Sequence, residues 1–255
     1  GYRRTMEVPA FVAPVSDSGE SDKQGAGFGV QMSDSPESDT QGRDSEGCSR
    51  RPGEERQHLQ AAGSQYGWMA DSRPETMIRD AKESALHLGV DTLDLLYSHG
   101  PDPAVPYEDQ CGALKQLLDE GVIKYAGISR VNNEQIDLAR GIIGSGLVAV
   151  QNQFSPSHPD PEHTMEHCAE LGLAFVCWSP LGGFLDTFDQ SAYDPFRTVA
   201  AQRGCSYQRV VLAWELTRYE RLFTIPSARN PQEINDSFAA TQLQLTQEEL
   251  AMLPC

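Results

Sequence analysis

The sequence predicts an α/β protein, and more specifically a (β/α)8 barrel that lacks or distorts its first two to three strands. From about Ser64 onward, short apolar runs alternate with longer stretches of helical period, which is typical of repeated strand-helix units. The runs are continuous in Leu, Ile and Val, as in parallel sheets covered on both faces. Five such units in succession favour a closed barrel. The alternative is an open doubly wound sheet, but the Gly-x-Gly-x-x-Gly turn expected after its first strand is not found.

The first expected helix is Pro74–Leu88, with Ser72 as its cap, Pro74 in its first turn and Gly89 as its stop. The last is Thr246–Leu253, where Thr246 and Glu249 form a capping box. Between them the expected strands are Thr92–Tyr97, Ile123–Ile128, Leu147–Val150, Ala174–Trp178 and Leu222–Ile225. The expected helices between and after these strands are Glu108–Glu120, Asn133–Ile143, Pro161–Leu171, Asp194–Arg203, Ser206–Arg218 and Pro231–Ala240.

Residues 1–63 differ in composition from the barrel domain that we expect over residues 64–255. Between residues 15 and 56 the chain is rich in Ser, Asp, Glu and Gly, and it contains a polar repeat, Ser16–Gly25 and Ser33–Gly42. So few apolar residues cannot offset the entropy of ordering, which predicts a disordered acidic segment. Only Val8–Val15 suggests a strand, so we expect a truncated N-terminal half of the barrel. An open barrel exposes strand edges, and an oligomer or protein partner would cover them.

The overall charge and hydropathy exclude several classes of protein. The 255 residues carry a net charge of −17, which disfavours contact with a phosphate backbone and predicts no nucleic-acid partner. No long apolar run and no secretory signal are found, so the sequence predicts no membrane association and a cytoplasmic location. Six scattered cysteines favour isolated thiols over disulfides or a zinc site.

Polar side chains follow every expected strand at the end where barrel enzymes carry their chemistry. These residues are His99, Ser129 and Arg130, Gln151 and Asn152, Ser179, and Ser227, Arg229 and Asn230. Together they predict a polar groove of amide, hydroxyl, guanidinium and imidazole groups. His158, His163 and His167 lack accompanying carboxylates in a metal-binding order, so no metal is expected.

Five ordered stretches resemble the aldo-keto reductase superfamily, and the resemblance extends over about residues 70–255. The stretches are Leu88–Pro103, Glu120–Ser129, Val148–Ser155, Trp178–Gly183 and Ile225–Pro231. This resemblance implies a (β/α)8 barrel that reduces a small-molecule aldehyde or ketone to the alcohol with NADP(H). It also implies that His99 orients and polarises the substrate carbonyl.

The resemblance further implies a cofactor site. Ser129, Gln151 and Asn152 match positions that hold the nicotinamide carboxamide, and Trp178 matches the residue that stacks on the nicotinamide ring. Three residues match the loop along the pyrophosphate, and three match the strand end at the adenosine 2′-phosphate. The first set is Ser179, Leu181 and Gly183, and the second is Ser227, Arg229 and Asn230. Because arginine donates two parallel hydrogen bonds to a phosphate, we expect NADP rather than NAD.

The sequence departs from the family pattern at several positions. Arg130 replaces the usual Asn, Ser227 replaces a Lys of some members, and Glu233 and Ser237 replace residues that clamp the adenine end. The catalytic Asp, Tyr and Lys of the first three strands are not found, and aligning the Tyr-Gly step with residues 66–68 puts Gln65 in place of the Lys. A non-catalytic relative that binds a nucleotide or a protein therefore remains the alternative. The sequence does not identify the substrate.

Overall fold

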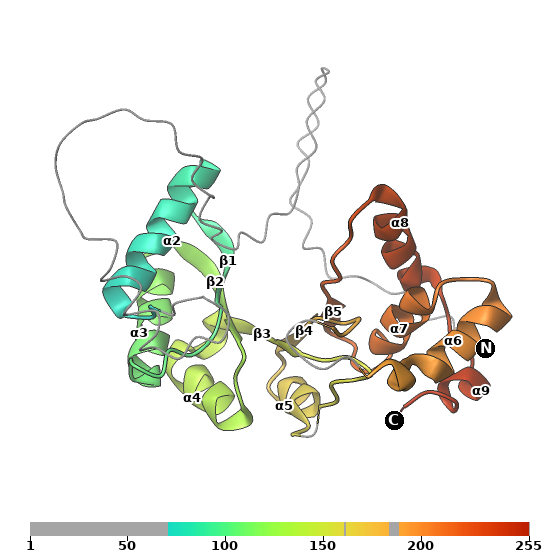
Figure 1. The fold of residues 1–255 in the computed structure, drawn as a ribbon. Helices are drawn as coiled ribbons and strands as arrows, with labels where there is room; N and C mark the ends of the chain where they lie inside the picture. Colours follow the sequence, from blue (N-terminus) through green and yellow to red (C-terminus); the bar gives the residue numbers. More distant parts are fainter. Residues whose placement is uncertain (1–70, 161, 184–188, 255) are drawn as a thin grey trace, which may run out of the picture. The chain divides into compact units, whose positions relative to one another are not determined.

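The computed structural model describes residues 71–160, 162–183 and 189–254. A five-stranded parallel sheet runs through them in the order β1-β2-β3-β4-β5 (Figure 1). The strands are β1 (Leu93–Ser98), β2 (Ile123–Ser129), β3 (Leu147–Gln153), β4 (Ala174–Trp178) and β5 (Leu222–Thr224). This sequential order confirms the expected succession of parallel strands and lacks the reversal of a doubly wound sheet. The predicted disordered segment 1–63 and Tyr66 lie outside the described residues.

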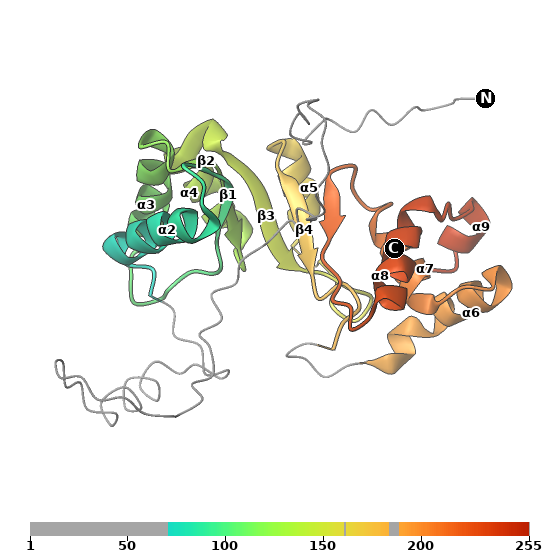
Figure 2. The same ribbon diagram turned by 90° about the horizontal axis from the view of Figure 1, so that it is seen from above.

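Helices connect the strands, and each crossover returns the chain to the same end of the sheet (Figure 2). The helices are α2 (Pro74–Leu88), α3 (Tyr107–Asp119), α4 (Asn133–Ile143), α5 (Thr164–Glu170), α6 (Asp194–Arg203), α7 (Tyr207–Glu215), α8 (Pro231–Ala239) and α9 (Gln247–Leu250). Short 3₁₀ turns lie at Gly144–Gly146, Gln190–Tyr193 and Ala240–Gln242. In the described ranges, no helix is both long enough and apolar enough to span a membrane.

The two faces of the sheet differ in burial. Alternate strand residues such as Ile128, Val150 and Phe175 are almost fully buried and pack into the main core with α3, α4 and α7. On the opposite face, Leu95 is 42% exposed and Phe223 is 58% exposed. Because successive strand residues point to opposite faces, the described helices cover one face of this sheet. Within the described ranges the sheet is open between β5 and β1, as one part of a barrel wall.

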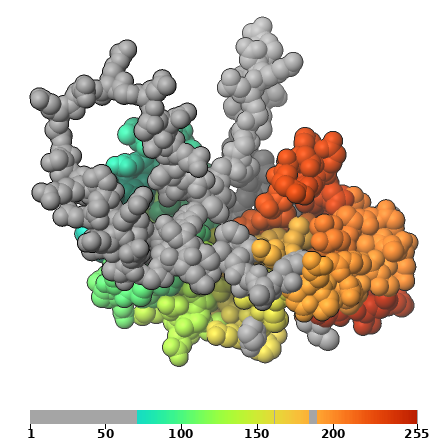
Figure 3. Space-filling model, in the orientation of Figure 1, coloured from blue at the N-terminus to red at the C-terminus, as the bar shows by residue number. Residues whose placement is uncertain are grey.

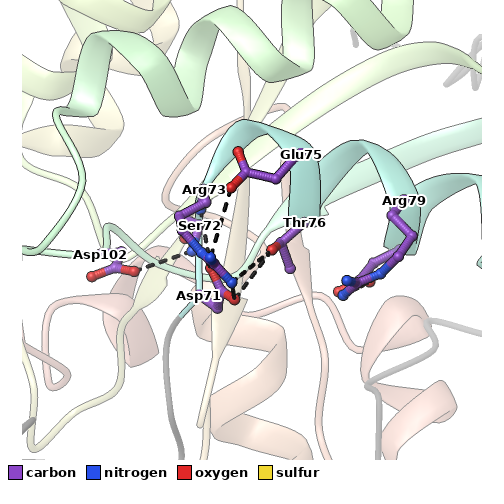
Figure 4. A network of polar contacts seen from close by, with 8 residues as sticks. Asp71, Ser72, Arg73, Glu75, Thr76, Arg79 and Asp102 are labelled. Carbon is purple, nitrogen blue, oxygen red and sulfur yellow. Dashed lines mark hydrogen bonds and ion pairs between the residues drawn. The ribbon is translucent and has the colours of Figure 1, made fainter.

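The start of α2 differs from the expectation that Ser72 caps it (Figure 4). Asp71 supplies the side-chain acceptor, since its carboxylate accepts from the backbone N of Arg73 at 3.3 Å and from Oγ1 of Thr76 at 3.1 Å. The backbone N of Ser72 donates instead to Oδ2 of Asp102 at 3.1 Å. Asp102 lies in the loop after β1, so this hydrogen bond ties the start of α2 to the carboxyl end of the sheet.

The start of α5 also differs, because the sequence predicts a helix from Pro161, which lies outside the described residues. The helix begins at Thr164, where Asp160 accepts from the backbone N of Thr164 at 3.0 Å and of Met165 at 2.9 Å. His163 has a left-handed φ of 55°, which a helix cannot continue through. The capping box at Thr246 and the unpaired state of Cys111, Cys168, Cys177 and Cys205 are confirmed.

Candidate active site at the carboxyl ends of the strands

The strand register places several expected site residues side by side at one edge of the sheet. Ser129 of β2 pairs with Gln151 of β3, and Gln153 pairs with Trp178 at the end of β4. His99 directly follows β1. These side chains come from four neighbouring strands and share the edge at which barrel enzymes carry their chemistry.

Ser129 and Gln151 are joined by a hydrogen bond at this edge. The Ser129 hydroxyl is buried and donates to the backbone O of Gln151 at 2.7 Å. β3 continues to Gln153, three residues beyond its expected end, since its backbone still pairs with β4. Gln151 and Asn152 are consequently strand residues that point to opposite faces.

Asn152 uses both ends of its amide on the chain itself. Its Oδ1 accepts from the backbone N of Val131 at 3.1 Å, and its Nδ2 donates to the backbone O of Val131 at 2.7 Å. The side chain thus holds the loop between β2 and α4 against the end of β3. This loop begins directly after Ser129 and carries Arg130, so Asn152 positions Arg130.

Arg130 extends across the edge of the sheet. Its φ of 57° is rare for a side chain of this size, and its backbone N donates to the O of Gln151 at 3.1 Å. The guanidinium carbon lies over the indole of Trp178, 5.3 Å from the ring centroid, which is a cation–π distance. The Cδ of Arg130 also lies close to Gly100, the residue after His99, 3.4 Å from where a Cβ would be. One cation therefore lies between the ends of β1 and β4.

The protonation of His99 is set by its surroundings. Partial burial lowers the pKa of His99, and the positive charge of Arg130 lowers that pKa further. His99 is therefore predominantly neutral at pH 7. A neutral imidazole has one N–H donor and one acceptor nitrogen, so it can donate a hydrogen bond to a carbonyl oxygen without carrying a charge.

A pocket of about 430 Å³ lies beside this edge, between the loops that follow β2 and β3. Its walls include Asn152 and Trp178, which the sequence predicts as site residues, but not His99. They also include Arg130, which belongs to the predicted polar groove, and Gln153 and His158, which were not predicted as site residues. The alternation along β3 identifies Gln153 as a partner of Gln151 once the strand is known to continue that far.

The loop after β4 exposes backbone groups. Ser179 has a φ of 50°, and Gly182 and Gly183 have φ values of 69° and 83°. The backbone N of Gly182 donates to the O of Ser179 at 2.9 Å, which closes a tight turn. Leu181 packs against the hydrophobic core and anchors this turn. Positive φ at two glycines lets a ligand approach the backbone closely.

The segment after β5 leads into α8. Asn230 caps the helix by accepting from the backbone N of Glu233 at 2.9 Å. Arg229 forms an ion pair with Glu233, 2.9 Å from Nη2 to Oε1, and Ser227 is exposed. Among the described side chains, no group of three or more His, Cys, Asp or Glu residues is arranged to hold a metal ion.

Comparison with known proteins identifies the class to which this fold and edge belong. The model of the Aldo/keto reductase family matches residues 57–254. The chain is 28% identical over 198 residues to pyridoxine 4-dehydrogenase of Escherichia coli K12, covering 75% of this chain and 67% of that protein. It is 27% identical over 209 residues to aldo-keto reductase str7 of Strobilurus tenacellus, covering 70% of this chain and 62% of that protein.

Solved structures agree with this assignment. Aldose reductase from Giardia lamblia matches with a TM-score of 0.63 and 25% identity, over 72% of this chain and 68% of that one. A Bombyx mori aldo-keto reductase in complex with NADP matches with a TM-score of 0.61 and 22% identity, over 78% and 71%. The chain belongs to the aldo/keto reductase family, and its five described parallel strands form part of the (β/α)8 barrel of that family. It spans about two thirds of the length of the curated relatives that it matches.

Proposed function

We propose that this chain is an oxidoreductase that reduces an aldehyde or ketone group of a small molecule to the alcohol with NADP(H). The main observation behind this proposal is the position of four residues at the carboxyl ends of β1 to β4, which form one edge of a parallel sheet. These residues are His99, Ser129, Gln151 and Trp178. Family membership and the NADP complex of the Bombyx mori relative support this proposal.

The donor set fits a nicotinamide dinucleotide. The Gln151 side chain lies on the strand face opposite to Asn152, where its amide suits a carboxamide, and Ser129 fixes the backbone of Gln151. The indole of Trp178 offers a flat apolar surface for a ring. The Ser179–Gly183 turn offers backbone N–H groups to phosphates, and Arg229 lies at the strand end that the resemblance assigns to the adenosine end of the cofactor. When bound, the cofactor supplies the hydride.

His99 and Arg130 would act on the carbonyl oxygen. A neutral His99 donates a hydrogen bond that polarises the carbonyl, and this donation requires the proton on the nitrogen that faces the substrate. As negative charge develops on the oxygen, the nearby Arg130 guanidinium stabilises it, because a cation in a partly desolvated site acts strongly on developing charge. Arg130 thus provides positive charge at an edge where the family lysine was not found.

A proton must also reach the alkoxide, and this requirement favours a second candidate function. Tyr97 is the tyrosine nearest in sequence to His99, but its ring lies against Gly127 and burial raises the pKa of Tyr97 to about 12. A phenol with so high a pKa is a poor acid at neutral pH, and general acid catalysis contributes about 10² to 10⁴ in rate. Nucleotide binding with slow or no turnover is therefore the alternative.

A titration of the purified chain with NADPH tests the proposal. Protein fluorescence is recorded for the wild type and for Trp178→Phe and Trp178→Leu, and an aromatic aldehyde is then added while NADPH absorbance is followed. We expect saturable binding, weaker in Trp178→Leu than in Trp178→Phe, and oxidation of NADPH. Binding without oxidation would establish the alternative, and no binding would contradict both.

A further inference from the structure

Arg229 and Glu233 form a closely bonded pair at the start of α8. The carboxylate of Glu233 accepts from Nη2 of Arg229 at 2.9 Å and from its backbone N at 2.8 Å. It also accepts from Nδ2 of Asn230 at 3.1 Å, while Asn230 in turn caps the backbone N of Glu233. The guanidinium of Arg229 is therefore already oriented by an internal carboxylate.

Both members of the pair are charged at neutral pH. The hydrogen bonds from Arg229 and the charge of its guanidinium lower the pKa of Glu233, and Glu233 raises the pKa of Arg229. The pair lies at the surface, where the Arg229 side chain is 89% exposed and α8 stands out from the neighbouring helices (Figure 3). A ligand arriving from solvent meets a neutral pair rather than a free cation.

This location is where a barrel commonly binds phosphate, namely the loops after its last two strands together with a helix N-terminus. Arg209 of α7 is likewise paired with an acid of α8, because its Nε donates to Oδ1 of Asp236 at 3.0 Å. A phosphate dianion would have to displace Glu233 from Arg229 and would be repelled by its carboxylate. Ribose hydroxyls can instead donate to a carboxylate, as they do to the acidic residue of NAD sites.

We propose that Glu233 is a specificity-determining residue that withholds Arg229 from the 2′-phosphate, so that the chain binds NADH about as tightly as NADPH. This inference rests on the proposed function, because it concerns the same cofactor site. It adds that the expected preference for NADP is largely cancelled by one side chain. Glu233→Gln keeps an acceptor for Asn230 but frees the guanidinium.

The test is fluorescence titration of NADPH and NADH against the wild type, Glu233→Gln and Glu220→Gln. The last variant removes one negative charge from an exposed residue outside this pair and controls for net charge. In the wild type we expect the two dissociation constants to agree within about fivefold. In Glu233→Gln we expect NADPH to bind ~10-fold more tightly, with NADH little changed, since a charge-assisted hydrogen bond becomes available.

A second pair of variants checks the inference through Arg229 itself. Arg229→Gln is expected to leave NADPH binding by the wild type nearly unchanged but to abolish the gain made by Glu233→Gln. A wild type that already prefers NADPH strongly, with no change in Glu233→Gln, would overturn the inference and leave the proposed function intact. If neither nucleotide binds any of the proteins, both the inference and the proposed function are wrong.

Discussion

The charge of Arg130 acts on His99 across the edge of the sheet, and this coupling can be measured. Arg130 lowers the pKa of His99, in addition to the effect of burial. Arg130→Asn should therefore raise the pKa of His99, because the imidazolium no longer meets a neighbouring positive charge. NMR titration of the imidazole C–H resonances would follow this change.

The matched control for this prediction is Arg218→Gln. Arg218 also stacks on a tryptophan, with its guanidinium carbon 5.4 Å from the ring centroid of Trp214. Losing that cation should leave the titration of His99 where it is. If both variants shift His99 equally, then loss of net positive charge, and not proximity, determines the effect.

Burial of Glu215 in α7 makes the stability of the helix layer depend on pH. Glu215 is fully buried beside Cys177 and Tyr193, and neither carboxyl oxygen has a hydrogen-bond partner among the described residues. Desolvation raises the pKa of Glu215 well above its usual 4.5. The folded chain keeps this proton at a pH where the unfolded chain has released it. Stability therefore falls as pH rises above 4.5, by about 1.4 kcal/mol per unit, until the raised pKa is reached.

Glu215→Leu should remove this slope. The variant should be more stable than the wild type at both pH 4 and pH 7, because Leu removes a buried carboxyl that has no hydrogen-bond partner among the described residues, and the gain should be markedly larger at pH 7, as measured by urea denaturation at both values. Asp71 and Glu249 have lowered pKa values and contribute the opposite slope, but they are present in both proteins and cancel in the difference. The exposed Glu220→Gln serves as control. A gain that does not depend on pH would mean that Glu215 is not held neutral.

Local sequence patterns predict elements whose ends depend on nearby residues. The apolar runs of the five strands and the Thr246 capping box are of this kind, and both are confirmed. The start of α2 does not depend on nearby residues alone, because the backbone N of Ser72 bonds to Asp102, thirty residues away. The end of β3 was also missed, since Gln151 to Gln153 are polar and are held in the strand by pairing with β4.

Contacts between residues that are distant in the sequence also limit what the sequence predicts about the site. The strand ends predict that His99, Ser129 and Gln151 share an edge, because parallel strands place their carboxyl ends together. They do not reveal that Asn152 turns away to hold Val131, or that Arg130 lies over Trp178. Both features depend on the φ of Arg130 and on the alternation of β3, which only the fold specifies.

At the scale of the whole molecule, the excess of acidic residues should decide how salt affects stability. The chain carries 37 acidic and 20 basic residues, so the excess negative charges repel one another when the chain is compact. Ion pairs such as Arg79–Asp80 and Lys115–Asp119 are exposed, and each such pair contributes only about 0 to 1 kcal/mol. Raising ionic strength from about 10 mM to 100 mM shortens the screening length from about 30 Å to about 10 Å. Long-range repulsion is then weakened more than these short contacts are.

The melting temperature should consequently rise with NaCl over this range. An equal osmolality of a neutral sugar serves as control, since it changes hydration without screening charge. A fall in melting temperature with salt would mean that the ion pairs, including the partly buried Arg203–Glu249 and Arg209–Asp236, outweigh the net repulsion. The same range of NaCl concentration should also affect cofactor binding. If repulsion dominates, screening should also strengthen binding of NADPH more than that of NADH, because NADPH carries the additional phosphate charge.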